Sequence, residues 1–285
     1  MKLIESKAEL VLQQEGLEGV YKQIELCGRT CYKSEDKITE DSAKGFVDRM
    51  IKSNHTAMLE HGTVYLALPM ETIIPSNAGC WGKYLGKYSK GSIVCTVNGE
   101  QRVAITTNLR VLVEHGWLDD LKYICEPTEY HERRYTLKLT TDRGVSHELV
   151  RHRVFSFAQE STRYCNYSKD KFNNELTFIF PHWLLNRDHD KFTKALKDAQ
   201  KYYFTLLDQG WTPQEARQVL PNALKTEICM TGFESDWKHF LDLRYFEVTG
   251  KAHPDMKELA TKIVEQFKDT LELCKPEEPA KTEEK

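Results

Sequence analysis

The chain lacks several features that mark whole classes of protein. It contains no apolar run that approaches the roughly 20 residues of a membrane-spanning helix, and no internal repeat is evident. Residues 1–7 lack the apolar core of a signal peptide, so we expect a cytoplasmic protein that has no membrane partner. The formal net charge is only -3, so no global basic field attracts nucleic acid. Any anion site must therefore be local.

The cysteines and histidines also lack the spacing of common sites. The chain has 8 cysteines in 285 residues, and without a secretion signal we predict free thiols rather than a disulfide framework. Cys27 and Cys31 have no second pair at zinc spacing, and His55 and His61 have no third ligand nearby, so we predict no metal site. No cysteine lies in a recognisable nucleophile motif.

What is present is an ordinary globular composition. Apolar residues make up 40% and charged residues 29%, and the length is ample for a core. Alternating and helical hydrophobic patterns both occur, which predicts an α+β fold with a mixed sheet and long amphipathic helices. We expect one domain over residues 1–274 with an insertion at about 71–130, followed by a disordered tail over 275–285.

Local patterns predict the individual elements. Strands are expected at 3–4, 10–12, 63–69, 92–97, 101–106, 135–141, 176–181 and 224–231. Asn98-Gly99 is a strong hairpin turn. Helices are expected at 19–27, 39–52, 109–115, 145–153, 189–208, from 213, at 237–244 and at 254–274. The basic, tyrosine-rich stretch 83–90 is either a contact for an anionic ligand or, more often in proteins, a solvated loop.

One stretch has an unusual concentration of positive charge. Arg-His-Arg at 151–153 is followed by the hydroxyls of Ser161 and Thr162 and by a further cation, Arg163. Adjacent like charges repel and gain nothing in a core, whereas guanidinium and hydroxyl groups together bind phosphate. A solvated basic helix face is the alternative. Apolar residues interleaved with the cations indicate partial burial and favour the anion site.

This stretch resembles the signature of the flavin-dependent thymidylate synthases, which is Arg-His-Arg, seven residues, Ser, and then x-Arg-Tyr. Residues 151–153, the seven residues 154–160, Ser161 and residues 162–164 match it in order and spacing. Residues 55–61 resemble the family's His-x-Ser/Thr-x-Leu-Glu-His segment. The resemblance extends in separate blocks from His55 to Arg244, and the insertion has no counterpart.

Three more segments resemble the family. Arg217 stands in an Ala-Arg-x-x-Leu-Pro element, and 240–244 matches Phe-Leu-x-Leu-Arg. Arg29, within 28–32, is either the counterpart of an arginine in a family segment or an exposed residue of a surface turn.

The resemblance implies the flavin-dependent thymidylate synthase fold and an enzyme of the methyltransferase class. The implied reaction converts dUMP to dTMP, with 5,10-methylenetetrahydrofolate as carbon donor and FAD, reduced by NADPH, as hydride source. A protein whose cofactor supplies the hydride must mainly bind, align and polarise its substrate. Family members are homotetramers with active sites shared between subunits, so the same assembly is implied, with dUMP, folate and NADPH as partners.

The resemblance also implies residue roles. Arg244 would contact the uracil edge and is the candidate catalytic residue; Ser161 is not interpreted as a nucleophile, because no base is specified beside it. The implied dUMP-binding residues are Glu148, Arg151, Gln159, Glu160, Ser161, Thr162, Arg163, Arg217 and Arg244. The implied FAD-binding residues are His55, Ala57, Arg151, His152, Arg153, Gln159, Ser235 and His239.

The sequence departs from the family pattern at several positions. Glu148 stands where the family more often has Gln, and Gln159 where it more often has Glu, so the acid and the amide are exchanged between these two positions. Ala57, Ala158, Gln159 and Phe233 replace a hydroxyl residue, Asn, Glu and Asn, respectively. A non-catalytic nucleotide-binding protein that lost the flavin is therefore an alternative. An RNA-binding protein that uses residues 151–163 and 83–90 is another, although the net negative charge disfavours it.

Overall fold

The computed structural model describes residues 1–69, 80–84, 86–97, 100–169 and 172–271. Its strands are β1 (Lys2–Ile4), β2 (Lys7–Val11), β3 (Thr63–Pro69), β4 (Lys90–Val97), β5 (Glu100–Asn108), β6 (Arg134–Asp142), β7 (Ser156–Gln159), β8 (Thr177–Ile179) and β9 (Lys225–Phe233). Its α-helices are α1 (Gly16–Tyr32), α2 (Ser42–Lys52), α3 (Leu109–Glu114), α4 (Arg143–Leu149), α5 (Asp190–Asp208), α6 (Pro213–Ala216), α7 (Glu234–Arg244) and α8 (Pro254–Phe267). Short 3-10 helices are η1 (Glu35–Lys37), η2 (Thr56–His61), η4 (Cys80–Tyr84), η5 (Leu118–Tyr123), η7 (His182–Leu184) and η8 (Arg217–Val219).

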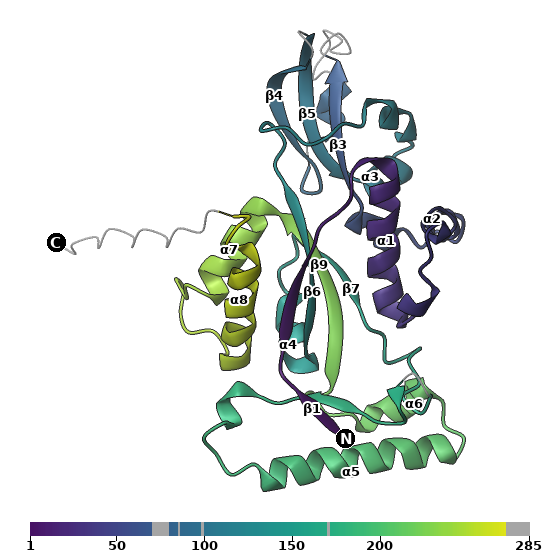
Figure 1. Cartoon of the computed structure of the whole chain (residues 1–285), viewed down its shortest axis with the longest axis vertical. Coiled ribbons are helices and arrows are strands. Elements are labelled where there is room, and N and C mark those ends of the chain that lie inside the picture. Colours follow the sequence, from purple (N-terminus) through teal and green to yellow (C-terminus); the bar gives the residue numbers. More distant parts are fainter. Residues whose placement is uncertain (70–79, 85, 98–99, 170–171, 272–285) are drawn as a thin grey trace, which may run out of the picture.

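A four-stranded antiparallel sheet in the order β2-β6-β9-β7 forms the centre of the molecule. Leu137 and Ile228 on one face belong to the core that also contains Trp237 of α7 and Leu259 of α8. Alternate side chains point to opposite faces of a strand, and Cys229 accordingly belongs to the core formed with α1, α2 and β3. Figure 1 shows α7 and α8 on one side of this sheet and α1 and α2 on the other.

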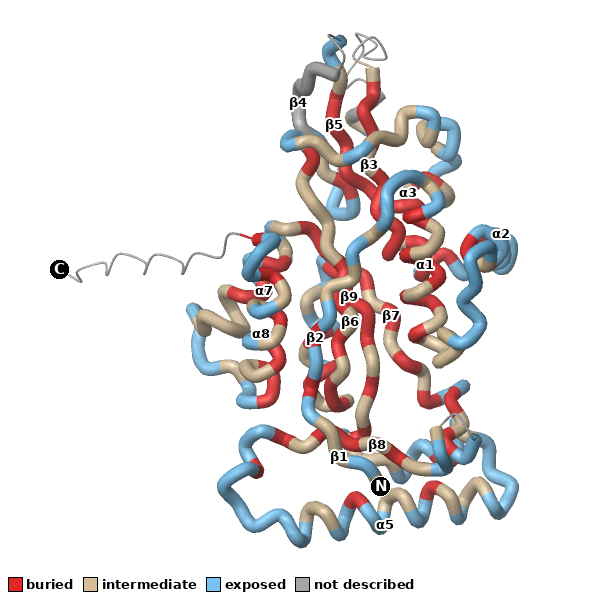
Figure 2. The backbone as a smooth tube through the Cα atoms, in the orientation of Figure 1, coloured by how far each residue is buried: buried red, intermediate tan, exposed pale blue. Residues whose placement is uncertain are grey.

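Two smaller sheets lie at the ends of the central one (Figure 1). The antiparallel sheet β3-β5-β4 confirms the predicted hairpin strands, and β5 pairs with β3 from Thr63↔Asn108 to Pro69↔Arg102. The predicted turn at 98–99 lies outside the described residues. At the other end, β1 pairs in parallel with β8. The long helix α5 lies beside this pair, and Figure 2 shows that much of its surface is exposed.

The α+β prediction is confirmed, and the strand predicted at 63–69 coincides with β3. The single-domain prediction stays a prediction, and the tail at 275–285 lies outside the described residues. Five cysteines are free thiols: Cys27, Cys31, Cys125, Cys165 and Cys229. In the part of the chain that the structure describes, no helix is both long and apolar enough to cross a membrane.

The predicted helix at 145–153 was too long. Helix α4 ends at Leu149, and Arg151 and His152 follow in turns that bond back to the carbonyls of Glu148 and Leu149. The chain then forms β7, which the sequence did not predict, and β7 pairs with β9. Because the chain leaves the helix after Leu149, the adjacent cations no longer share one helix face. Phe155 is buried against Gly232, where a Cβ added to the glycine would lie 2.4 Å from the phenyl ring.

The structure also bears on two segments for which the sequence left alternatives open. Residues 28–32 are not a surface turn, because α1 continues to Tyr32; Gly28 packs against Phe46, and Arg29 pairs with Glu25 at 2.9 Å. The stretch 83–90 is not simply a solvated loop, because the Tyr84 ring is buried and its hydroxyl donates to Asp120 at 2.6 Å.

Candidate functional site

The end of the β6–β9 pair brings together two segments that lie far apart in the sequence. Asp142 is opposite Lys225, and its Oδ1 accepts a hydrogen bond from Val145 N at 2.7 Å, which caps α4. Arg143 N donates to Asn222 O at 2.8 Å. The start of α4 is thereby fixed beside the segment that precedes β9 and includes Arg217.

Between these segments lies a cavity of about 310 Å³, which we call the Arg143–Arg217 cavity. Its lining contains no carboxylate and consists of Arg143, Thr162, Arg217, Gln218, Leu220, Pro221, Asn222 and Leu224. Arg217 Nη1 donates to Thr162 Oγ1 at 3.4 Å, and Arg143 Nη1 to Glu160 O at 3.5 Å. Neither guanidinium forms an ion pair with a described carboxylate. Two arginines and a hydroxyl without a competing acid are suited to a phosphate group.

The loop that carries Ser161 and Thr162 is held at both sides. Ser161 N donates to Cys31 O at 2.9 Å, which ties the loop to the end of α1. The Glu160 carboxylate is buried, where Lys225 lies at 2.9 Å and the Tyr167 hydroxyl donates at 2.9 Å. These contacts occupy the Glu160 side chain and leave its backbone carbonyl to Arg143. Direct nucleotide binding by that carboxylate stays a prediction.

Lys225 also belongs to a charge network on the sheet. It pairs with Glu227 at 2.7 Å, and Glu227 pairs with Lys138 at 2.8 Å and Lys33 at 3.0 Å. Burial opposes ionisation of Glu227, but the surrounding lysines outweigh it and hold the pKa of this carboxyl well below its ordinary value. The Glu227 carboxylate therefore stays negatively charged among three lysines. Its ion pair with Lys225 helps to hold that lysine beside Glu160.

Arg163 lies outside the cavity lining. It is exposed, and its Nε donates to Gln214 Oε1 at 3.2 Å. Its guanidinium lies over the Tyr164 ring, 5.3 Å from the ring centroid. A phosphate contact from Arg163 therefore requires the side chain to leave Gln214. The contact between Arg163 and Gln214 lies at the surface, so the side chain can leave it. The role of Arg163 in phosphate binding stays a prediction.

A second group of predicted residues meets where α7 ends. Arg244 Nη1 lies 3.1 Å from Glu148 Oε2, and Arg244 Nε donates to His152 Nε2 at 3.1 Å. Burial, followed by the charge of Arg244 and the proximity of His239, lowers the pKa of His152 to about 4. His152 is therefore neutral at pH 7, and its Nε2 lone pair accepts the bond from Arg244.

Gln159, on β7, does not join this group through a hydrogen bond. Its Nε2 donates to Ser146 Oγ at 2.9 Å and to Thr226 Oγ1 at 3.2 Å. Gln159 and Glu148 thus have separate partners among the described residues. The sequence had raised an exchange of acid and amide between these two positions, and the structure shows no hydrogen bond that couples them.

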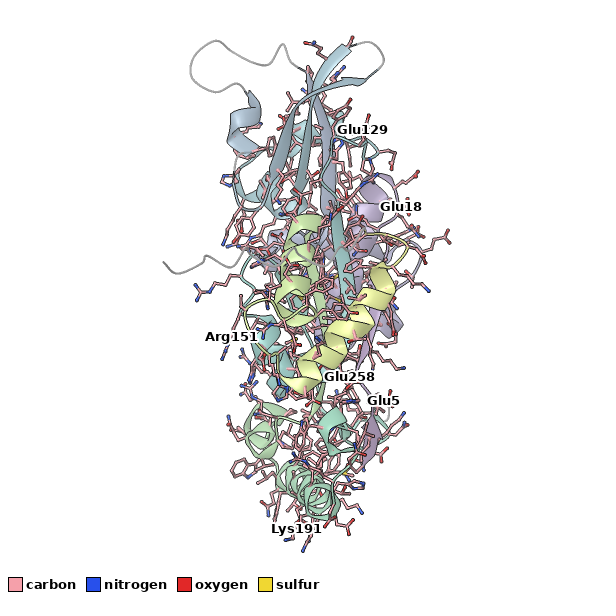
Figure 3. All side chains as sticks on the ribbon, turned by 90° about the vertical axis from the view of Figure 1, so that its left-hand side faces the viewer. Glu5, Glu18, Glu129, Arg151, Lys191 and Glu258 are labelled. Atoms are coloured by element: carbon pink, nitrogen blue, oxygen red, sulfur yellow. The ribbon has the colours of Figure 1, made fainter. Side chains whose placement is uncertain are left out.

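The predicted FAD residues lie on several elements. Arg151 and Arg153 are exposed and form no ion pair with a described residue. His152, between them, contacts Phe240 and Arg244 of α7, and Figure 3 shows Arg151 at the outer surface. His55 and Ala57 are exposed at η2, on the α1 side. Ser235 lies in the first turn of α7, and its backbone N–H donates to Glu132 at 3.1 Å.

The donor set around residues 151–153 nevertheless fits an anionic cofactor such as FAD. Arg151 and Arg153 present guanidiniums without carboxylate partners among the described residues, as binding a pyrophosphate requires. His55 and Ala57 lie at η2, which packs in the core with α1 and α2. The described residues contain no group of three or more metal-ligating side chains.

Sequence reasoning missed Arg143. It directly follows Asp142, a residue type that favours helix N-caps, and this is the one local signal that Arg143 stands at an element boundary. Its neighbour Arg217 is 74 residues later in numbering, and only the pairing of β6 with β9 brings the two together. The fold and the Arg143–Arg217 cavity together define a protein suited to a phosphate-bearing small molecule.

Comparison with known proteins gives the family. The model of the thymidylate synthase complementing protein family matches residues 127–271, slightly more than half of the chain. The chain therefore belongs to this family.

Individual relatives match over shorter shares of their length. The flavin-dependent thymidylate synthase of Pyrococcus abyssi is 34% identical over 134 residues, which is 46% of this chain and 52% of the relative. That of Sulfolobus acidocaldarius is 30% identical over 165 residues, 58% of this chain and 57% of the relative. The chain thus spans about half the length of the curated relatives it matches. A solved structure, the UMP/dUMP methylase PolB from Streptomyces cacaoi bound with 5-Br dUMP, aligns over 94% of this chain and 93% of that chain, with 17% identity and a TM-score of 0.45.

Proposed function

We propose that this protein is a flavin-dependent thymidylate synthase, a methyltransferase that converts dUMP to dTMP. The carbon donor is 5,10-methylenetetrahydrofolate, and FAD reduced by NADPH is the hydride source. The observation that carries the proposal is the acid-free Arg143–Arg217 cavity, which adjoins the loop of the Arg-His-Arg…Ser signature in a chain of this family.

In this proposal, the cavity holds the dUMP phosphate. Arg143 and Arg217 supply charge, and Thr162 supplies a neutral donor. Ser161 and Arg163 complete the phosphate contacts from the same loop, with Arg163 exchanging Gln214 for the ligand. Each arginine is without a carboxylate partner among the described residues, so phosphate binding does not require an ion pair to be broken.

Arg244 polarises the uracil ring. Its guanidinium is directed by Glu148 and by the neutral imidazole of His152. A charge-assisted hydrogen bond to a uracil oxygen stabilises the electron-rich form of the base that attacks a one-carbon unit from C5. Arg244 thus acts on the reacting base, whereas Glu148 and His152 orient it.

FAD, when bound, supplies the hydride that turns a transferred methylene into a methyl group. Arg151, His152 and Arg153 bind it from one chain, and His55, the backbone at Ala57, Gln159, Ser235 and His239 contribute the remaining contacts. Residues of η2 pack in the core on the α1 side of the central sheet, whereas His152 contacts Phe240 of α7 in the core on the other side. This separation supports sites shared between chains, and we propose a homotetramer. The expected cytoplasmic location stays a prediction.

The test is the visible absorption spectrum of the purified protein, recorded without oxygen. A flavin band should bleach with NADPH and return only when both dUMP and methylenetetrahydrofolate are added. The Arg244→Ala variant should still bind flavin and bleach, but should form dTMP much more slowly. A colourless protein that does not take up added FAD would contradict the proposal.

The second candidate is a non-catalytic nucleotide-binding protein. Ala57 has no hydroxyl for a flavin, and the Ser235 N–H is already bonded to Glu132, so two implied cofactor contacts are weak. This candidate predicts dUMP binding without any flavin band. Salt-sensitive RNA binding without dUMP binding would instead support the RNA-binding alternative.

A further inference from the structure

A second cavity, of about 290 Å³, lies away from the residues discussed so far. It is enclosed by the connection from β2 to α1, the start of β6, β3 and the segment 124–127. Arg133 and Arg134 both line it, so we call it the Arg133–Arg134 cavity. None of the implied dUMP or FAD residues is part of its lining.

Neither arginine of this cavity has an acidic partner among the described residues. Arg133 Nη2 donates to Pro127 O at 3.3 Å, and Arg134 Nη1 donates to Glu60 O at 3.1 Å, both backbone carbonyls. The nearby Glu60 carboxylate instead pairs with Arg110. A partly buried guanidinium that pairs with no carboxylate gains from the charge of an anionic ligand.

Unused donors accompany this charge. Arg134 Nε is buried without a hydrogen-bond partner. Burial lowers the pKa of the Arg134 guanidinium to about 10, which still leaves it charged at pH 7. The Gln23 side chain also lines the cavity; it is only 4% exposed, and its amide makes no hydrogen bond to a described residue. Buried polar groups of this kind are normally satisfied.

The beginning of α1 adds further donors. Glu15 and Gly16 line the cavity. Glu15 is the N-cap of this 17-residue helix, and its side chain accepts no hydrogen bond from the first backbone amides of the helix. Free amides at a helix start favour an anion. The lining also contains the carboxylates of Glu15 and Glu126, but both residues are exposed, so their charges can stay in water at the rim.

We propose that the Arg133–Arg134 cavity is a second anion-binding site, which takes a small molecule through its carboxylate or phosphate group. The anion pairs with Arg133 and Arg134 and accepts a hydrogen bond from the Gln23 amide. The site is separate from the Arg143–Arg217 cavity and does not depend on the proposed enzymatic function. Its volume suits a small metabolite or the charged end of a larger one.

Cys125 provides a local reporter, because it is a half-buried cysteine in the cavity lining. The experiment measures the rate at which iodoacetamide alkylates Cys125 in the intact chain, by peptide mass spectrometry. Inorganic phosphate and succinate are the probes, and sodium chloride keeps the ionic strength constant. A bound anion should slow alkylation severalfold; the more effective probe identifies the preferred group.

Variants assign the effect to the cavity. Arg133→Gln should abolish the protection, Arg133→Lys should restore part of it, and Arg187→Gln, a remote control beside Trp183, should leave it intact. Gln23→Leu should weaken protection without removing a charge, and circular dichroism checks that each variant folds. Failure of both probes to slow alkylation of the wild-type chain, or equal protection in Arg133→Gln, would overturn the proposal.

Discussion

Arg244 Nε donates a hydrogen bond to His152 Nε2 at 3.1 Å and so joins the end of α7 to the Arg-His-Arg run. This bond requires His152 to accept at Nε2 and therefore to be neutral there. The sequence motifs that contain these two residues are 92 positions apart. Their contact links the candidate catalytic arginine to a residue implied in cofactor binding.

Replacing Arg244 by Gln should raise the pKa of His152 from about 4. Burial is the main cause of the lowered pKa and remains in the variant, so the new value should stay below the ordinary 6.5. Imidazole NMR titration of the folded protein measures the change. Arg153→Gln serves as a control, since its exposed guanidinium is not among the causes of the shift. An unchanged pKa in Arg244→Gln would show that the charge of Arg244 does not contribute to the lowered pKa of His152.

Arg143→Gln should weaken dUMP binding by about 2 kcal/mol, or roughly 30-fold. The variant removes one of two guanidiniums in the Arg143–Arg217 cavity, whereas the contacts to the base remain. Calorimetric titration with dUMP and with deoxyuridine separates the two effects, because deoxyuridine has no phosphate and should lose little affinity. Arg187→Gln is the matched control. Equal losses for both ligands would argue against a phosphate contact at Arg143.

Gly232→Ala should destabilise the fold by about 2 kcal/mol. An added Cβ would lie 2.4 Å from the Phe155 ring, so that ring must move. Urea unfolding measures the loss, and the double variant with Phe155→Leu should recover part of it because the smaller side chain leaves space. Additive losses in the double variant would show that the ring is not the source of the strain.

The sequence predicted the elements whose formation depends on residues close together in the chain. Alternating apolar residues predicted the strand at 63–69. Thr212-Pro213 predicted the start of α6, where the Glu215 side chain accepts a hydrogen bond from Thr212 N at 2.8 Å. Both depend on side chains within a few residues of each other.

The missed features depend on distant partners. Strand β7 has only four residues, SFAQ, and is stabilised by pairing with β9 rather than by a pattern of its own. Arg143 becomes a candidate binding residue only through the same sheet, which places it beside the Arg217 segment. The proposed roles of His55 and Ala57 involve a second chain, which no pattern in one sequence locates.

His61 should make the folded state sensitive to acid. Its ring is fully buried, and its Nδ1 lies 2.7 Å from Thr231 Oγ1. Burial, followed by the nearby charge of Arg134, lowers the pKa of His61 to about 3. As the pH falls below the ordinary value of 6.5, His61 takes up a proton in the unfolded chain but not in the folded one. The free energy of unfolding should therefore fall, by up to about 1.4 kcal/mol per pH unit from this residue.

Urea unfolding of the wild type and of His61→Asn, at several values between pH 7.5 and pH 5, tests this expectation. The variant should be less stable at pH 7.5, because the smaller side chain packs less well in the core. The difference should narrow as the pH falls, since only the wild type loses the His61 contribution. His152 also has a lowered pKa, but it is present in both proteins and cancels in the comparison. A difference that stays constant with pH would mean that His61 is protonated equally in the folded and unfolded states.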